Sequence, residues 1–213
     1  GAVTLVIERL ETVPPVPWLR RVEGDRPAPD VAAFGLRNGW MWEGGTEAGR
    51  PLWIWGAGHV GAAVAQVAAP LPDFAVTCIE DDASRWPALP PAVRPLLAAD
   101  MARAMTHAPR DALHLIVTYS HDIDLALCHA ALARGFGFCG LIGSDTKWAR
   151  FRARLRDLGH SEADIAKITC PIGDRRLGKH PQAIAVGVVA GLLFAELSGE
   201  TAGDQWFDDT SDA

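Results

Sequence analysis

The residues with the clearest chemical potential form a glycine-spaced turn: Gly56, Gly58 and Gly61. An apolar run precedes this turn and a helix-like stretch follows it, at residues 51–55 and 60–69. In nucleotide-binding β-α units the first glycine allows the tight turn, the second lets backbone N–H groups approach a phosphate, and the third permits close helix–strand contact. The spacing predicts a phosphate site at a helix N-terminus. The alternative is a turn that only packs a helix against a sheet.

A carboxylate strengthens this interpretation. Residues 74–79 read as a second strand that ends at Glu80, about 20 residues beyond the turn, where an acid accepts hydrogen bonds from a ribose diol. The pair of features predicts a Rossmann-type unit. Because a carboxylate repels a 2′-phosphate, any dinucleotide bound there is expected to be NAD rather than NADP.

A histidine lies in the turn after another predicted strand, residues 113–118. In the run that starts at Ser120, helix capping explains the serine and the acids Asp122 and Asp124 without any function. Capping does not explain His121, whose imidazole suits proton transfer or anion contact near neutral pH. An exposed His121 with no function is the open alternative.

Two further loops carry glycines and cations. Gly143, Ser144 and Lys147 follow the predicted strand 136–142 and outline an anion site, with an N-cap and a solvated lysine as the alternative. The loop at residues 170–181 also contains glycines, and its cations are Arg175, Arg176 and Lys179. By itself that last loop is ambiguous.

These residues need a scaffold in which strands and helices alternate. Strands are predicted at residues 52–55, 74–80, 96–98, 113–118 and 136–142, and helices at 60–69, 122–134, 145–158, 161–167 and 182–197. The alternation predicts an α/β fold: a three-layer, Rossmann-like parallel sheet with helices on both faces. In such sheets ligands bind beyond the carboxyl ends of the strands, where all these turns fall.

The remaining segments divide the chain into three parts. Residues 1–50 are predicted to be the remnant of an N-terminal domain plus a Pro/Gly-rich linker, with a strand at residues 2–8 and a hairpin around Asn38-Gly39. Residues 51–197 form the Rossmann-like domain. Residues 198–213 are an acidic tail that is expected to be disordered.

Composition excludes several classes of function. The 213 residues are 49% hydrophobic and carry a net charge of −6, with no basic cluster, so nucleic acid is not an expected partner. The four cysteines lack CxxC spacing and fit buried thiols in a reducing compartment. The apolar run at residues 183–197 is too short to span a bilayer. We therefore expect no membrane segment, no metal site and a cytoplasmic location.

The motifs together resemble those of the XdhC/CoxI family, maturation factors for molybdenum hydroxylases such as xanthine dehydrogenase. The matching segments cover about 150 residues in one order, which is more specific than any glycine motif. They lie at residues 56–61, 118–125, 140–151, 170–173 and 178–185.

The resemblance implies a protein that binds molybdenum cofactor (molybdopterin), protects it during sulfuration and delivers it to a xanthine dehydrogenase-type apoenzyme. It also implies a cysteine desulfurase as a partner, leaves a homodimer open, and favours an accessory protein over an enzyme. The cofactor-binding residues expected on this basis are Gly56, Gly58, His59, Gly61, Glu80, His121, Gly143, Ser144 and Lys147.

Two departures limit the resemblance. Family members often have a histidine at the position of Tyr119, so only His121 carries over from a histidine pair. They also have a cysteine-bearing segment that would lie upstream of Gly1, and we expect the molybdenum-facing thiol there. Two other functions stay open, an NAD-dependent oxidoreductase with His121 and Lys147 in catalysis, and a nucleotide-binding regulatory module.

Overall fold

A computed structural model of the protein describes residues 7, 9, 18–29, 35–43 and 49–198. The chain divides into two compact units, Gly1–Ala48 and Gly49–Ala213. The predicted strand at residues 2–8 and the acidic tail fall almost wholly outside the described residues, and both stay predictions.

The first unit contains a three-stranded antiparallel sheet in the order β1-β3-β2. Its strands are β1 (Trp18–Arg21), β2 (Gly35–Arg37) and β3 (Trp40–Glu43). Asn38 and Gly39 join β2 to β3 with φ angles of 55° and 81°, the left-handed conformation that a two-residue hairpin turn requires. The predicted hairpin is confirmed. Strand β1 was not predicted, because the prolines before it obscure any alternating pattern.

The second unit is built on a six-stranded sheet in the order β6-β5-β4-β7-β8-β9, with every neighbouring pair parallel. The strands are β4 (Arg50–Trp55), β5 (Phe74–Glu80), β6 (Arg94–Leu97), β7 (Leu113–Ile116), β8 (Phe138–Leu141) and β9 (Ile168–Thr169). The central strands are buried on both faces, which explains their continuous apolar runs.

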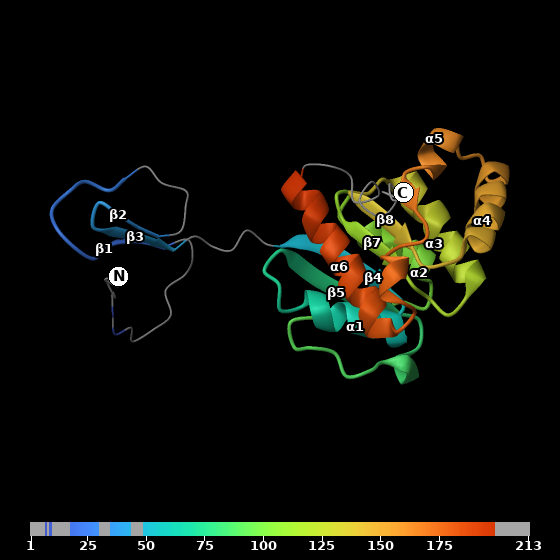
Figure 1. The fold of residues 1–213 in the computed structure, drawn as a ribbon, viewed down its shortest axis with the longest axis horizontal. Coiled ribbons are helices and arrows are strands. Elements are labelled where there is room, and N and C mark those ends of the chain that lie inside the picture. The colour runs from blue at the N-terminus through green and yellow to red at the C-terminus, as the bar shows by residue number, and fades with distance from the viewer. Residues whose placement is uncertain (1–6, 8, 10–17, 30–34, 44–48, 199–213) are drawn as a thin grey trace, which may run out of the picture. The chain divides into compact units, whose positions relative to one another are not determined.

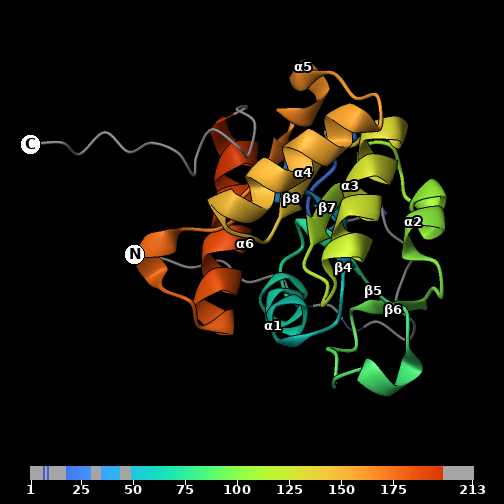
Figure 2. The same ribbon diagram turned by 90° about the vertical axis from the view of Figure 1, so that its right-hand side faces the viewer.

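Helices cover both faces of this sheet, as Figures 1 and 2 show. They are α1 (His59–Ala68), α2 (Met101–Ala104), α3 (His121–Arg134), α4 (Asp145–Asp157), α5 (Glu162–Ile165) and α6 (Pro181–Ser198). Single 3-10 turns lie at η1 (Ala83–Arg85), η2 (Met105–His107) and η3 (Arg175–Leu177). Helices α1 and α6 share one core with the sheet, and α2, α3, α4 and α5 share the other. The predicted three-layer α/β class is therefore confirmed.

The strand order has a consequence for function. The chain leaves β4 toward β5 and β6 on one side and returns to β7, β8 and β9 on the other, so the order reverses beside β4. Connections from the carboxyl ends of adjacent strands then diverge and leave a crevice at that edge of the sheet. Within the described part of the chain, no helix is long and apolar enough to cross a membrane.

One polar side chain is fully enclosed in the sheet. His114 on β7 is 0% exposed, and Trp55 Nε1 donates a hydrogen bond to His114 Nδ1 at 3.2 Å. Burial, with the nearby charge of Arg134 as a second cause, lowers the pKa of His114 to about 4. The folded protein therefore holds a neutral imidazole that the unfolded chain would protonate at mildly acidic pH.

This difference predicts a pH-dependent stability. The folded pKa lies below the ordinary value near 6.5, so the stabilisation is complete above that pH and is lost as the pH falls toward 4. Between pH 7 and pH 5 the loss should be about 2 kcal/mol. In His114→Asn, which keeps an acceptor for Trp55, urea unfolding at the two pH values should show a smaller difference. An unchanged difference would contradict this assignment.

Candidate functional site

The glycine turn lines a pocket of about 310 Å³ at the carboxyl ends of β4, β5 and β7. We call it the glycine-turn pocket. Its lining residues are Gly56, Gly58, His59, Val60, Glu80, Arg85, Val117, Thr118, Tyr119 and Ile142. The structure thus brings three of the predicted turn residues and Glu80 to one place.

Two of the three glycines are required by the fold itself. Gly56 has a φ of +107°, and a Cβ there would lie 2.8 Å from the carbonyl oxygen of Val117. A Cβ on Gly61 would overlap the carbonyl oxygen of Gly56, where α1 approaches the turn. Both positions therefore need glycine whether or not the pocket binds anything.

Gly58 is different. A Cβ there would meet nothing within 4 Å, and its φ of −64° is open to any residue. Gly58 is also the N-cap of α1, which has no side-chain cap and no acidic residue in its first turn. The helix N-terminus therefore keeps its positive potential beside open space, which is the arrangement that favours an anion.

Glu80 holds the glycine turn through a hydrogen bond from the backbone of that turn. It is 2% exposed, and its Oε2 accepts a hydrogen bond from the Ala57 N–H at 2.9 Å. Its Oε1 accepts from the Asp81 N–H at 3.0 Å and lies 3.6 Å from Arg85 Nη1. The carboxylate expected to receive a ribose diol thus has partners within the chain, and it fixes the position of the turn.

A cation and an aromatic ring border the same pocket, and the sequence patterns gave no role to either. The Arg85 guanidinium lies 4.0 Å from the centre of the Tyr119 ring and pairs with Asp81 at 2.5 Å. The Tyr119 hydroxyl donates to Asp81 Oδ2 at 2.8 Å. Tyr119 is 62% exposed, so this cluster presents an aromatic and cationic surface at the pocket's rim.

Lys147, which is expected to contact an anion of the ligand, is paired within the chain. Its Nζ lies 2.6 Å from Asp124 Oδ2 and 2.8 Å from the Ile142 carbonyl oxygen, and its side chain is only 10% exposed. Asp124 is 2% exposed and also accepts a hydrogen bond from Thr118 Oγ1 at 2.7 Å. A lysine at a helix start needs a compensating anion, and here the chain supplies that anion itself.

His121 and Ser144 are exposed residues at the starts of α3 and α4. His121 is exposed, lines neither pocket described here, and has its nearest ring contact with Phe151 at 6.4 Å between centres. Ser144 caps α4 by accepting from the Lys147 N–H at 3.2 Å. Its exposed hydroxyl, together with Gly143, borders a second pocket.

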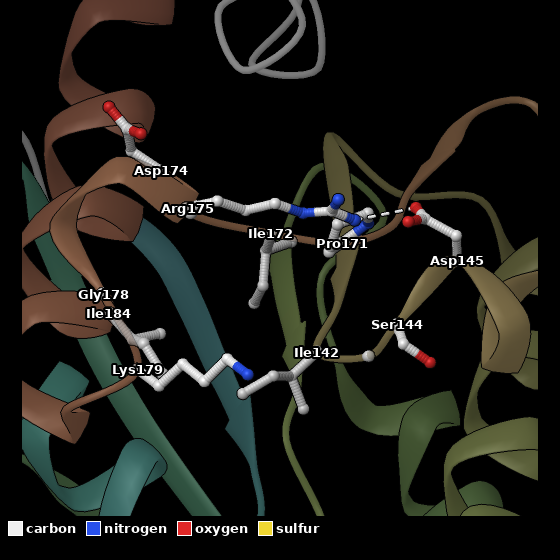
Figure 3. Close-up of a pocket in the computed structure, with 12 residues that line it drawn as sticks. Ile142, Ser144, Asp145, Pro171, Ile172, Asp174, Arg175, Gly178, Lys179 and Ile184 are labelled. Carbon is white, nitrogen blue, oxygen red and sulfur yellow. Dashed lines mark hydrogen bonds and ion pairs between the residues drawn. The ribbon is translucent and has the colours of Figure 1, made fainter.

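This second pocket has a volume of about 570 Å³ and lies beyond the ends of β8 and β9. We call it the loop pocket (Figure 3). Its lining residues are Ile142, Gly143, Ser144, Asp145, Pro171, Ile172, Gly173, Asp174, Arg175, Gly178, Lys179 and Ile184. Ile142 lines both pockets, so the two adjoin at this side chain, and the glycine-turn pocket lies at the switch in strand order.

None of the four thiols is suited to bind a metal. Cys78, Cys128, Cys139 and Cys170 are all buried. Burial raises the pKa of Cys78 and of Cys170 to about 12, and it also raises the pKa values of Cys128 and Cys139. They are therefore neutral thiols near pH 7, whereas a metal binds the thiolate. No cluster of three potential metal ligands occurs among the described residues.

The fold and the crevice together define a Rossmann-type domain, in which a glycine turn and a helix N-terminus lie at the strand-order switch. Residues 52–192 match the family model of the XdhC Rossmann domain. Because that match covers more than half of the chain, the protein belongs to the XdhC Rossmann domain family. The resemblance inferred from the motifs is confirmed.

Two known proteins illustrate the relationship. YqeB of Escherichia coli strain K12, an uncharacterized protein, is 30% identical over 139 residues, which make up 65% of this chain and 26% of YqeB. The crystal structure of a xanthine dehydrogenase from Bacillus halodurans has a TM-score of 0.58 at 19% identity, covering 72% of this chain and 44% of that one. The second likeness shows the fold alone. The chain spans less than half the length of either protein.

The surroundings of Gly61 and Gly58 predict unequal losses of stability when each glycine is replaced. Gly61→Ala should lower the free energy of unfolding by about 3 kcal/mol, because its methyl group collides with backbone. Gly58→Val should lower it by no more than about 1 kcal/mol, the scale of a changed N-cap. Urea unfolding measures both. A strongly destabilised Gly58→Val would mean that this glycine serves the fold and not a ligand.

The buried ion pair predicts a structural role for Lys147. Lys147→Met leaves the Asp124 carboxylate buried without its cation and should cost about 3 to 5 kcal/mol of stability. The double variant Lys147→Met with Asp124→Asn removes that charge and should recover part of the loss. Lys167→Met breaks an exposed pair with Asp164 and serves as the control, with an expected effect below about 1 kcal/mol. Equal stability of all three variants would refute the assignment.

Proposed function

We propose that this chain is the Rossmann-domain part of a maturation factor that binds molybdenum cofactor and delivers it, sulfurated, to a xanthine dehydrogenase-type apoenzyme. A cysteine desulfurase is the proposed source of the sulfur. The observation that carries the proposal is the open position at Gly58: no neighbouring atom and no backbone strain demands a glycine there, so the space suits a ligand's phosphate. Membership of the XdhC Rossmann domain family supports the choice of ligand.

The residues of the crevice fit the phosphate-bearing end of such a cofactor. The exposed backbone at Gly58 and His59 would hold the phosphate at the start of α1, and Gly56 and Gly61 would shape the turn. Glu80 keeps that turn in place through the Ala57 N–H. Gly143 and Ser144 border the adjoining loop pocket. The bound cofactor supplies the molybdenum chemistry to the target enzyme, and this chain binds and shields it.

The side chains also favour a binding role over catalysis. His121, the expected proton relay, lines neither pocket, and Lys147 is engaged with Asp124. General acid–base catalysis requires a titratable group within hydrogen-bond reach of the reacting atoms. We therefore propose an accessory protein without turnover of its own, in which Lys147 positions the crevice and does not contact the ligand.

A dinucleotide is the second candidate ligand, and a specific observation favours it. Glu80 lines the glycine-turn pocket at the end of β5, the position from which Rossmann domains contact a ribose. Arg85 lies beside that carboxylate, 3.6 Å away, and a cation there accommodates a 2′-phosphate. Any dinucleotide binding should therefore discriminate weakly between NAD and NADP, contrary to the preference for NAD that Glu80 alone predicts.

The proposal is tested by titrating the chain with molybdenum cofactor, NAD and NADP in parallel, and measuring retained molybdenum and absorbance after gel filtration. Molybdenum cofactor should bind saturably to the chain, and Gly58→Val should weaken that binding at least about tenfold, the cost of one lost charge-assisted contact. Ala75→Val is the matched control, since Ala75 is exposed near the opposite end of β5. Wild-type affinity in folded Gly58→Val, or retention of NAD alone, would reject the proposal.

A further inference from the structure

The charges around the loop pocket nearly cancel in pairs. Asp145 accepts a hydrogen bond from Arg175 Nη2 at 2.7 Å. Asp174 accepts hydrogen bonds from Arg176 through both carboxylate oxygens: Oδ1 from Nε at 3.0 Å and Oδ2 from Nη2 at 2.7 Å. Hydrogen bonds from these arginines lower the pKa values of both carboxyl groups, so the two acids stay ionised. The arginines neutralise the negative charges of the two carboxylates.

Lys179 takes no part in these ion pairs. Within the described part of the chain it takes part in no hydrogen bond or ion pair, and both lining carboxylates already have arginine partners. Figure 3 shows its side chain extending across the loop pocket with the ammonium group directed toward Ile142. Because Ile142 also lines the glycine-turn pocket, this charge is directed toward the junction of the two pockets.

The wall of the loop pocket is apolar next to this charge. Ile142, Pro171, Ile172 and Ile184 contribute aliphatic surface, and Ile172 is buried at 6% exposure. Mostly apolar walls with a few placed polar or charged groups are typical of pockets that bind small molecules. At about 570 Å³ the loop pocket has room for a bicyclic heterocycle.

We infer that Lys179, and not Lys147, is the cation that binds the ligand's phosphate group, together with the N-terminus of α1 at Gly58, and that the loop pocket holds the planar ring of the same ligand. The ligand class is a phosphorylated bicyclic heterocycle whose phosphate lies at the junction of the two pockets. This inference rests on the proposed function and adds the binding mode and the residue that neutralises the phosphate.

Two probes separate the two halves of the site: inorganic pyrophosphate for the anion, and neopterin monophosphate for a ring joined to a phosphate. Calorimetry on the full chain should show that Lys179→Met weakens both probes at least about tenfold and flattens the salt dependence of their affinity. Lys179→Arg should retain most of the affinity. Lys167→Met, an exposed lysine in neither pocket, should leave both probes unaffected.

A third variant addresses the ring. Ile184→Trp should fill the loop pocket, and it should weaken neopterin monophosphate while leaving pyrophosphate unchanged. The inference is overturned if Lys179→Met binds pyrophosphate as the unmodified chain does, or if the unmodified chain binds neither probe. Loss of binding in Gly58→Val with no effect of Lys179→Met would overturn the inference and leave the proposed function standing. No effect of either variant would reject both.

Discussion

The crevice depends on the close approach of α1 to the end of β4. The carbonyl oxygen of Gly56 lies where a Cβ of Gly61 would be, so the helix can start this near the sheet only because Gly61 lacks a side chain. Gly56 lacks one for another reason, because its Cβ would approach the Val117 carbonyl oxygen. Glu80 completes the arrangement by accepting the Ala57 N–H from the neighbouring strand β5. These contacts hold the turn without requiring a glycine at position 58, where a Cβ would meet no atom within 4 Å. The helix N-terminus is then presented to the crevice as a fixed, uncapped positive end.

The distribution of charge decides which cations are available to a ligand. Lys147 is bound to Asp124, and through Asp124 and Thr118 it connects the starts of α3 and α4 to the end of β7. Arg85 is engaged by Asp81 and Tyr119, and Arg175 by Asp145. Lys179, which lines the loop pocket, has no such partner among the described residues. A buried, paired lysine supports the walls of a site, whereas an unpaired one can neutralise an incoming phosphate.

Much of the fold could be predicted from the sequence, because buried parallel strands read as apolar runs and the turns between them carry glycines and caps. Strand β5 was predicted at residues 74–80 as observed, and β4, α1, α3, α4 and α6 within a few residues. The short elements β1, β9 and α2 were missed. Two to four residues are too few to show a period, and β9 forms only through pairing with β8.

The site was predictable in outline and not in detail. The spacing of the glycines located the turn, and the end of the next predicted strand located Glu80. Both signals lie in short continuous stretches of the sequence. The partner of Lys147 could not be read from the sequence, because Asp124 lies 23 residues away on another helix and meets it only in the folded sheet. The same holds for Lys179. Its loop contains more cations than acids, but this excess does not tell which of the cations faces the loop pocket.

The binding mode is measured most directly by a crystal structure of this chain with molybdenum cofactor bound. We expect a phosphate within hydrogen-bond distance of the backbone N–H groups at the start of α1, with Lys179 beside it and the pterin ring against Pro171 and Ile172 in the loop pocket. Cofactor bound elsewhere on the chain, with the space above Gly58 left to solvent, would contradict it.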